Sequence, residues 1–162
     1  MSDQSLSSIE RRAASTTVHA TVGQCFAVGI DVEAYPNWIE SLVQVEIDAI
    51  DAAGNPARVR FEASGLGRRS SYVLAYDLSE APNGLGWTLV SGDLARAIEG
   101  WYRFSDVSED FARPMTKVDY ELTIDLAVPL PGFVKRRAED KIIEAALRRF
   151  KQEVERVATQ AG

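Results

Sequence analysis

TKVDYELTIDLAVPLPGFVKRRAEDKIIEAALRRF, residues 116–150, changes from one hydrophobic period to another along its length. Up to residue 128 apolar and polar residues alternate, which is the period of a β-strand with one buried face. The apolar positions are Val118, Tyr120, Leu122, Ile124, Leu126 and Val128. This stretch predicts a strand whose apolar face needs a cover.

A long amphipathic helix is predicted directly after this strand. Pro131 and Gly132 mark its start, and strong helix formers continue to about residue 158. Its apolar stripe consists of Val134, Ala138, Ile142, Ala146, Phe150, Val154 and Val157. Arg136, Glu139, Glu144, Arg148, Lys151 and Glu155 occupy the opposite face. At a rise of 1.5 Å per residue the helix is on the order of 40 Å long, so it can span a whole sheet.

The residues before 116 predict more strands and two short helices. Residues 11–20 are rich in β-branched residues and predict the first strand. Thr21 is the expected cap of a short helix, and Asp31 that of a second, which Pro36 should end. Further alternating segments follow at 42–51, 57–63, 68–78, 87–92 and 95–107. Short turns join them, which predicts an antiparallel sheet and an α+β fold.

Composition limits both the domain count and the partners. The 162 residues fit one domain with a sizeable core, which we expect over 11–160, after a flexible tail at 1–10. The net charge of −6 argues against nucleic acid as a partner, because phosphate binding needs an excess of Lys and Arg. The polar N-terminus and the lack of a long apolar run predict a cytoplasmic protein without integral membrane association.

Residues that would indicate a metal, a cofactor or covalent catalysis are scarce. The single cysteine, Cys25, excludes an internal disulfide, and its apolar neighbours predict a buried, inert thiol. The single histidine, His19, has no accompanying cysteine or carboxylate motif. No phosphate-binding, dinucleotide-binding or zinc-protease motif occurs. We therefore predict no metal and no cofactor.

Four stretches resemble one known superfamily. They are DVEAYPNWIESL (31–42), IEGWYRF (98–104), VDYELTIDL (118–126) and PLPGFVKRR (129–137). In this order they resemble the SRPBCC superfamily, which includes START domains and Bet v 1-type allergens. They are most similar to the bacterial polyketide cyclase/dehydrase and lipid-transport group. The resemblance extends over residues 11–158. It implies a helix-grip fold, in which a curved seven-stranded antiparallel sheet wraps around the C-terminal helix and encloses a hydrophobic cavity.

The residues expected to line that cavity come from strand parity and from the resemblance. They are Trp38, Phe61, Tyr72, Tyr76, Trp87, Arg96, Ile98, Tyr102, Phe104, Tyr120, Leu122, Phe133 and Ile142. Tyr72, Tyr76, Tyr102 and Tyr120 place four hydroxyl groups on one predicted face, where each needs a partner if it is buried. A cavity containing water or a polar ligand would supply such partners, whereas the alternative is a packed core.

Two of these residues allow contrasting interpretations. Arg96 shares parity with Ile98, so either it contacts an anion at the cavity rim or its strand starts later and it is solvated, with Asp93 as a nearby partner. Trp38, together with Tyr35, either anchors the short helices to the core or stands at the end of the cavity.

Three hypotheses for function follow. The first is binding, or transport, of a hydrophobic small molecule such as a lipid, a polyketide or a polyprenyl compound. The second is an aromatic polyketide cyclase/dehydrase, in which Arg96 and the tyrosines would have to supply the acid, base or oxyanion-stabilising groups. The third is a protein-interaction module, which would present an exposed apolar patch around Trp38 and Trp101.

Overall fold

The computed structural model describes residues 11–65 and 67–161. Its elements are β1 (Arg11–Val18), α2 (Val22–Ile30), the 3-10 helix η1 (Val32–Asn37), β2 (Leu42–Ile50), β3 (Pro56–Gly65), β4 (Arg68–Asp77), β5 (Gly84–Gly92), β6 (Ala95–Asp106), β7 (Thr116–Leu126) and α3 (Gly132–Ala161). The tail predicted at residues 1–10 lies outside the described part.

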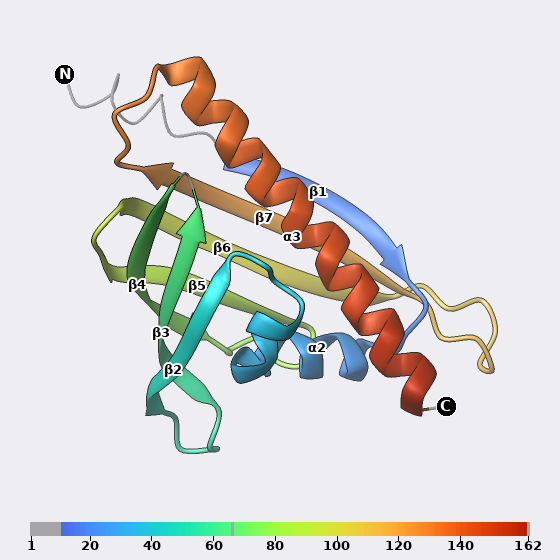
Figure 1. Ribbon diagram of the computed structural model, residues 1–162. Coiled ribbons are helices and arrows are strands. Elements are labelled where there is room, and N and C mark those ends of the chain that lie inside the picture. The colour runs from blue at the N-terminus through green and yellow to red at the C-terminus, as the bar shows by residue number, and fades with distance from the viewer. Residues whose placement is uncertain (1–10, 66, 162) are drawn as a thin grey trace.

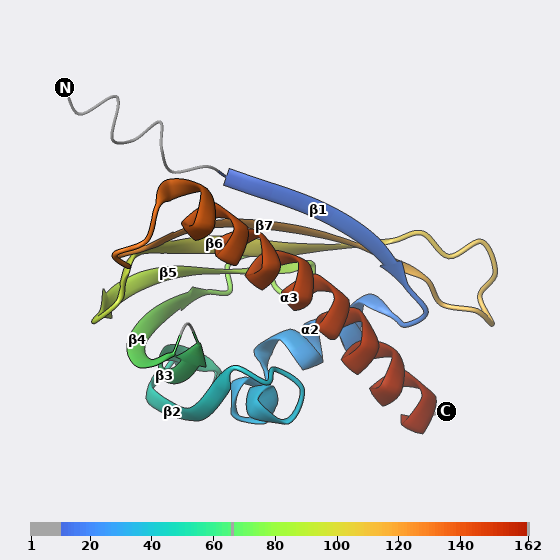
Figure 2. The ribbon, with the colours of Figure 1, turned by 45° about the horizontal axis from the view of Figure 1, so that its top comes forward.

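The strands form one antiparallel sheet in the order β1-β7-β6-β5-β4-β3-β2. The chain therefore pairs its first strand with its last, and the two edges of the sheet are β1 and β2. The sheet curves around α3, η1 lies beside the edge strand β2, and α2 packs against α3 and the strands β5 and β6 (Figures 1 and 2). This is the predicted helix-grip fold, with α3 packed inside the curve.

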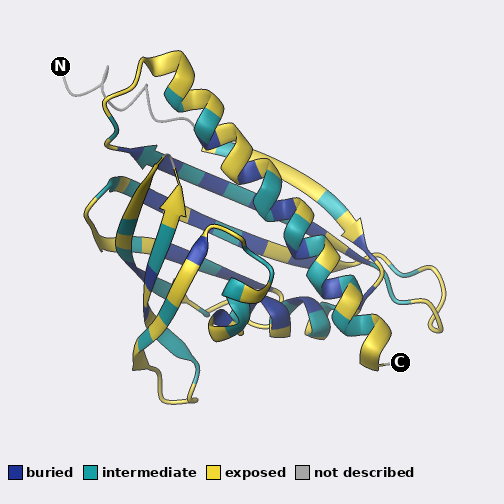
Figure 3. Cartoon of the chain, viewed as in Figure 1, coloured by how far each residue is buried: buried dark blue, intermediate teal, exposed yellow. Residues whose placement is uncertain are grey.

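β7 confirms the alternation that predicted it. Every second residue from Thr116 to Leu126 is buried, and the residues between them are partly or fully exposed. The buried residues face α3, and Figure 3 shows the same alternation along the strands beneath that helix. The register with β6 sets Tyr102 opposite Tyr120 and Gly100 opposite Leu122. Side chains of two neighbouring strands thus meet on the inner face.

The caps of the short helices were predicted in part. The Thr21 hydroxyl accepts from the Gln24 backbone N–H at 3.1 Å, and the Gln24 side chain accepts from the Thr21 N–H at 2.9 Å. This capping box fixes the start of α2 as expected. The prediction that Pro36 ends the second helix is wrong, because Pro36 lies inside η1. The chain continues through the proline because the Trp38 and Ile39 N–H groups both donate to the Tyr35 carbonyl.

The apolar stripe of α3 was predicted correctly only in its C-terminal half. Phe150 and Val154 are buried as expected, but in the first half Ile143 is buried and Ile142 is 42% exposed. Both isoleucines fit a helical period, so the pattern alone does not separate them. Burial of Glu139, which was predicted on the solvent face, has a local cause: its carboxylate accepts from the Leu126 N–H at 3.2 Å. That contact satisfies a backbone donor at the end of β7.

Candidate ligand cavity

A cavity of about 420 Å³ lies between the inner face of the sheet and α3. The curvature of the sheet holds its two sides apart, and two small residues of α3, Ala145 and Ala146, leave the space unfilled. The lining residues are Tyr35, Trp38, Ile39, Glu40, Ser41, Leu42, Phe61, Tyr72, Leu74, Tyr76, Trp87, Ile98, Tyr102, Tyr120, Leu122, Ile124, Lys141, Ile142, Ala145, Ala146 and Arg149. The cavity is within the usual size range for small-molecule sites.

Aromatic rings in mutual contact form much of its wall. Phe61 stacks with Tyr35 and Tyr72, at centroid distances of 6.0 and 5.3 Å. Across the sheet, Trp87 contacts Tyr102 at 5.3 Å and Tyr120 at 6.0 Å. These distances are typical of favourable ring pairs, so the rings hold one another in place. The wall is apolar and well packed before any ligand binds.

Gly100 explains how the Trp87 ring can lie against the sheet. The two residues are paired across β5 and β6. A Cβ atom at position 100 would stand 2.7 Å from the Trp87 ring and 2.7 Å from the Glu121 carbonyl oxygen. Neither distance is possible for a real side chain. Glycine therefore lets the indole occupy the inner face of β6, where it becomes part of the cavity wall.

Five tyrosine side chains border the cavity, and their hydroxyl groups fall into two sets. The Tyr76 hydroxyl donates to that of Tyr35, which in turn donates to the Gly29 carbonyl. Within residues 11–65 and 67–161, the hydroxyls of Tyr72, Tyr102 and Tyr120 form no hydrogen bond with another protein group.

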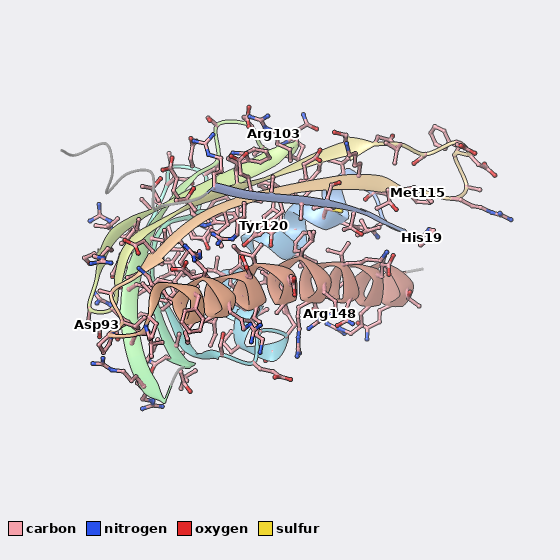
Figure 4. All side chains as sticks on the ribbon, turned by 90° about the horizontal axis from the view of Figure 1, so that it is seen from above. His19, Asp93, Arg103, Met115, Tyr120 and Arg148 are labelled. Carbon is pink, nitrogen blue, oxygen red and sulfur yellow. The ribbon has the colours of Figure 1, made fainter. Side chains whose placement is uncertain are left out.

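These three hydroxyls adjoin open space. In the described part of the chain, no fully buried polar side-chain atom lacks a partner. The hydroxyls of Tyr72, Tyr102 and Tyr120 therefore must reach the cavity volume, where water or a ligand can bond them. In Figure 4, Tyr120 lies between β7 and α3, on the inner side of the sheet.

Burial keeps these phenols protonated. It raises the pKa of Tyr72 to about 12 and holds the pKa values of Tyr76 and Tyr102 well above the usual value for a phenol. The cause is removal from water, which disfavours the charged phenolate. At neutral pH the cavity thus offers O–H groups that can donate to a ligand's oxygen atoms.

The charged lining residues lie where the cavity reaches the surface. Arg149 on α3 binds Glu40, in the turn between η1 and β2, with 3.0 Å between Nη2 and Oε1. The Glu40 side chain is 79% exposed, and Lys141 and Ile142 are also exposed. We call this side, made by Glu40, Lys141, Ile142 and Arg149, the mouth of the cavity.

Ten of the thirteen residues predicted to bind a ligand line this cavity. They are Trp38, Phe61, Tyr72, Tyr76, Trp87, Ile98, Tyr102, Tyr120, Leu122 and Ile142. Trp38 also packs against Phe150 of α3, at a centroid distance of 6.2 Å, so it anchors the turn and borders the cavity at the same time. The position of Trp38 therefore fits both interpretations, the anchor to the core and the border of the cavity. Its contact with a ligand stays a prediction.

The structure places Arg96 outside the cavity. Its side chain is 62% exposed and binds Asp125, with 3.1 Å from Nε to Oδ2. Strand parity does not hold at Arg96, because the pairing of β6 with β7 shifts register between Ala95 and Ala97. A bulge at that point turns Arg96 to the outer face although it is two residues from Ile98. Asp93, the partner considered from the sequence, instead accepts from the Ser71 N–H.

Phe104 and Phe133 also lie away from the cavity. Phe104 is 3% exposed and stacks with Phe150 at 6.0 Å, so it belongs to the packed core at one end of the sheet. Phe133 is 70% exposed in the first turn of α3, before the helix reaches the cavity. Parity identifies the inner face of a strand but not which part of that face is filled.

Apart from Ile142, the lining residues at and beside the mouth were not predicted from the sequence. Ile39, Glu40 and Ser41 lie in a turn, where no periodic pattern identifies an inward direction. Lys141, Ala145 and Arg149 follow one another at four-residue steps, so they share one strip of α3. That spacing is visible in the sequence, but charged residues at two of its three positions are typical of a solvent-facing strip.

The tryptophan patch expected of an interaction module does not form. Trp38 borders the cavity on the inner side of the sheet. Trp101 alternates with the inward Tyr102 and therefore lies on the outer side, where the Arg103 guanidinium stands 4.3 Å from its ring. The two rings lie on opposite faces.

The described residues contain no group of three or more His, Cys, Asp or Glu side chains that could hold a metal ion. His19 is exposed just beyond β1, and its backbone N–H donates to Glu155. Cys25 is buried in α2, where desolvation raises the pKa of its thiol to about 11 despite a hydrogen bond with Thr116. No helix in the described part is both long and apolar enough to cross a membrane.

Cys25 is expected to react slowly with alkylating reagents. Its pKa rises from 9.0 to about 11, so at pH 8 the thiolate fraction is about a hundredfold lower than that of an ordinary thiol. Iodoacetamide labelling, followed by mass spectrometry, should therefore be at least about a hundredfold slower in the native protein than in urea. Because the folded pKa is raised, labelling should accelerate as the pH rises toward 11. Equal rates in both states would contradict the burial of this thiol.

Comparison with known proteins agrees with the fold. A model of the family described as polyketide cyclase / dehydrase and lipid transport matches residues 11–155. A START superfamily protein from Mycobacterium smegmatis is similar in structure, with a TM-score of 0.79 and 19% identity over 91% of this chain and 98% of that chain. The Zhui aromatase/cyclase from Streptomyces sp. R1128 has a TM-score of 0.71 and 18% identity, over 91% and 94% of the two chains.

A third similar structure is TTHA0849 from Thermus thermophilus, with a TM-score of 0.74 and 19% identity over 94% of this chain and 99% of that chain. No curated protein matches the sequence. At such identities the structural likeness shows the fold, whereas the family model matches almost the whole chain. The protein therefore belongs to the polyketide cyclase/dehydrase and lipid transport family of the SRPBCC superfamily.

Proposed function

We propose that this protein binds a hydrophobic small molecule that carries hydrogen-bond acceptor oxygens. The observation that supports it most directly is the set of unpartnered tyrosine hydroxyls in an aromatic cavity of about 420 Å³. The rings favour a flat, apolar body, and the hydroxyls favour carbonyl or ether oxygens on that body. A hydrocarbon without oxygens would leave these donors unpaired or dependent on trapped water.

We propose that the ten predicted residues that line the cavity contact the ligand, together with Tyr35. Tyr102 and Tyr120 are the central donors. They lie opposite each other on β6 and β7, with ring centroids 4.9 Å apart, so the two rings border the same part of the cavity. Tyr72 lines the cavity from β4, elsewhere on the same sheet.

Removal of the two central hydroxyls tests this assignment. In the double variant Tyr102→Phe, Tyr120→Phe the rings remain, so affinity for a flat aromatic ketone such as a hydroxylated anthraquinone should fall about three- to thirtyfold. Affinity for a comparable aromatic hydrocarbon should change little. Both can be measured by ligand fluorescence. Equal losses for ketone and hydrocarbon would show that the variant damages the cavity rather than its hydrogen bonds.

A second candidate function is an aromatic polyketide cyclase/dehydrase. The same hydroxyls could donate to the enolate oxygens that form as a poly-β-keto chain cyclises, and the fold is similar to that of an aromatase/cyclase. However, among the described lining residues the charged groups are Glu40, Lys141 and Arg149, all at the mouth. Such a reaction would lack a carboxylate or histidine base in the inner cavity. Incubation with a poly-β-ketone and analysis of the products decides between binding and turnover.

A further inference from the structure

The mouth of the cavity carries two cations on one strip of α3. Lys141, Ala145 and Arg149 follow at four-residue steps, and all three line the cavity. The two charged residues are separated by two turns, on the order of 12 Å along the helix axis. On this strip only the small Ala145 lies between them, so the two cations occupy separate positions at the edge of the opening.

The two cations differ in their partners. Arg149 is neutralised by Glu40, at 3.0 Å across the mouth. Lys141 forms no ion pair or hydrogen bond with any residue in 11–65 or 67–161. The acidic residue before it, Asp140, is bound by Arg12, and Glu144 on the next turn does not pair with it. An unpaired ammonium group therefore stands beside an apolar cavity.

The inner cavity cannot accept a charge of its own. Apart from the residues of the mouth, the described lining residues are all uncharged. Burying an ionised carboxylate or phosphate there would be costly, because no opposite charge would compensate for its lost hydration. A charged group on a bound molecule is stabilised only at the mouth, where water and Lys141 both reach it.

We propose that the ligand is an amphipathic anion, with its apolar body in the cavity and a carboxylate or phosphate head group at Lys141. This deepens the proposed function and rests on it. Ile142 and Ala145, which adjoin Lys141 on α3, provide the apolar path from the head group to the aromatic wall. The ligand thus enters tail first, and the exposed head group remains in contact with solvent.

The test compares a charged probe with its neutral counterpart. Fluorescence titrations would use cis-parinaric acid and its methyl ester, which share the same apolar chain. Wild-type protein should bind the acid about three- to tenfold more tightly than the ester, as expected for an ion pair near the surface. Lys141→Gln should remove this preference and leave ester affinity unchanged. Higher salt should weaken acid binding in the wild type alone.

Arg148→Gln is the matched control. Arg148 is another cation on α3 that is exposed and does not line the cavity, so this variant should keep the preference for the acid (Figure 4).

Displacement of the bound acid by dodecanoate and by dodecyl phosphate then shows which head group is preferred. Equal affinities for acid and ester in the wild type, or a preference that survives Lys141→Gln, would overturn this inference alone. Failure of both probes to bind while the hydroxylated anthraquinone binds would likewise overturn this inference alone. Failure of all three to bind would overturn the proposed function as well.

Discussion

Phe150→Ala is expected to lower the free energy of unfolding by about 3–5 kcal/mol. Phe150 is completely buried, and its ring stacks with Tyr102 at 4.5 Å and with Phe104 at 6.0 Å. It is the main aromatic contact by which α3 holds the inner face of β6. Truncation removes these contacts and leaves a void that the surrounding rings cannot fill.

Urea unfolding monitored by circular dichroism measures this loss. Phe133→Ala provides the comparison, because Phe133 belongs to the same helix but is 70% exposed. Its truncation should change the free energy of unfolding by less than about 0.5 kcal/mol. If both variants lost the same stability, Phe150 would not be the anchor of α3.

The largest expected effect on binding comes from filling the cavity. Ala146 lines it from α3, and Ala146→Phe would place a ring in the volume a ligand needs. We expect affinity for the ligands tested above to fall about 5- to 100-fold, which corresponds to an overpacking cost of about 1–3 kcal/mol. Equilibrium titration with an anthraquinone or cis-parinaric acid measures it.

Two further variants make this result interpretable. Ala161→Phe introduces the same ring at an exposed position of α3, away from the cavity, and should bind as the wild type does. Ala145→Phe obstructs the cavity nearer the mouth, in case Ala146→Phe disturbs the fold. Unchanged affinity in both folded cavity variants would contradict ligand binding at this site.

The fold was largely predictable because its two deciding patterns are strong and continuous. β7 alternates without interruption, and α3 keeps a helical period over many turns. The phase of α3 was harder, since Ile142 and Ile143 both continue an apolar stripe and only the packing against the sheet selects Ile143. Burial of Glu139 depends on a backbone donor of β7, which no local pattern reveals.

The candidate site was predictable where strands are regular. Tyr102 and Tyr120 follow from parity alone because the ladder between β6 and β7 is unbroken around them. Arg96 was misplaced because parity does not survive a bulge. The residues of the turn before β2, including Glu40, have no period to indicate their direction. Their place at the mouth arises from tertiary contact with α3.

The position of the tryptophans has a practical consequence. The chain has three, of which Trp38 and Trp87 border the cavity while Trp101 lies on the outer face beneath Arg103. Occupancy of the cavity changes the polarity around two of the indoles and leaves the third in an unchanged environment. The emission spectrum of the unlabelled protein therefore contains both an internal signal for the filling of the cavity and a constant reference against which to measure it.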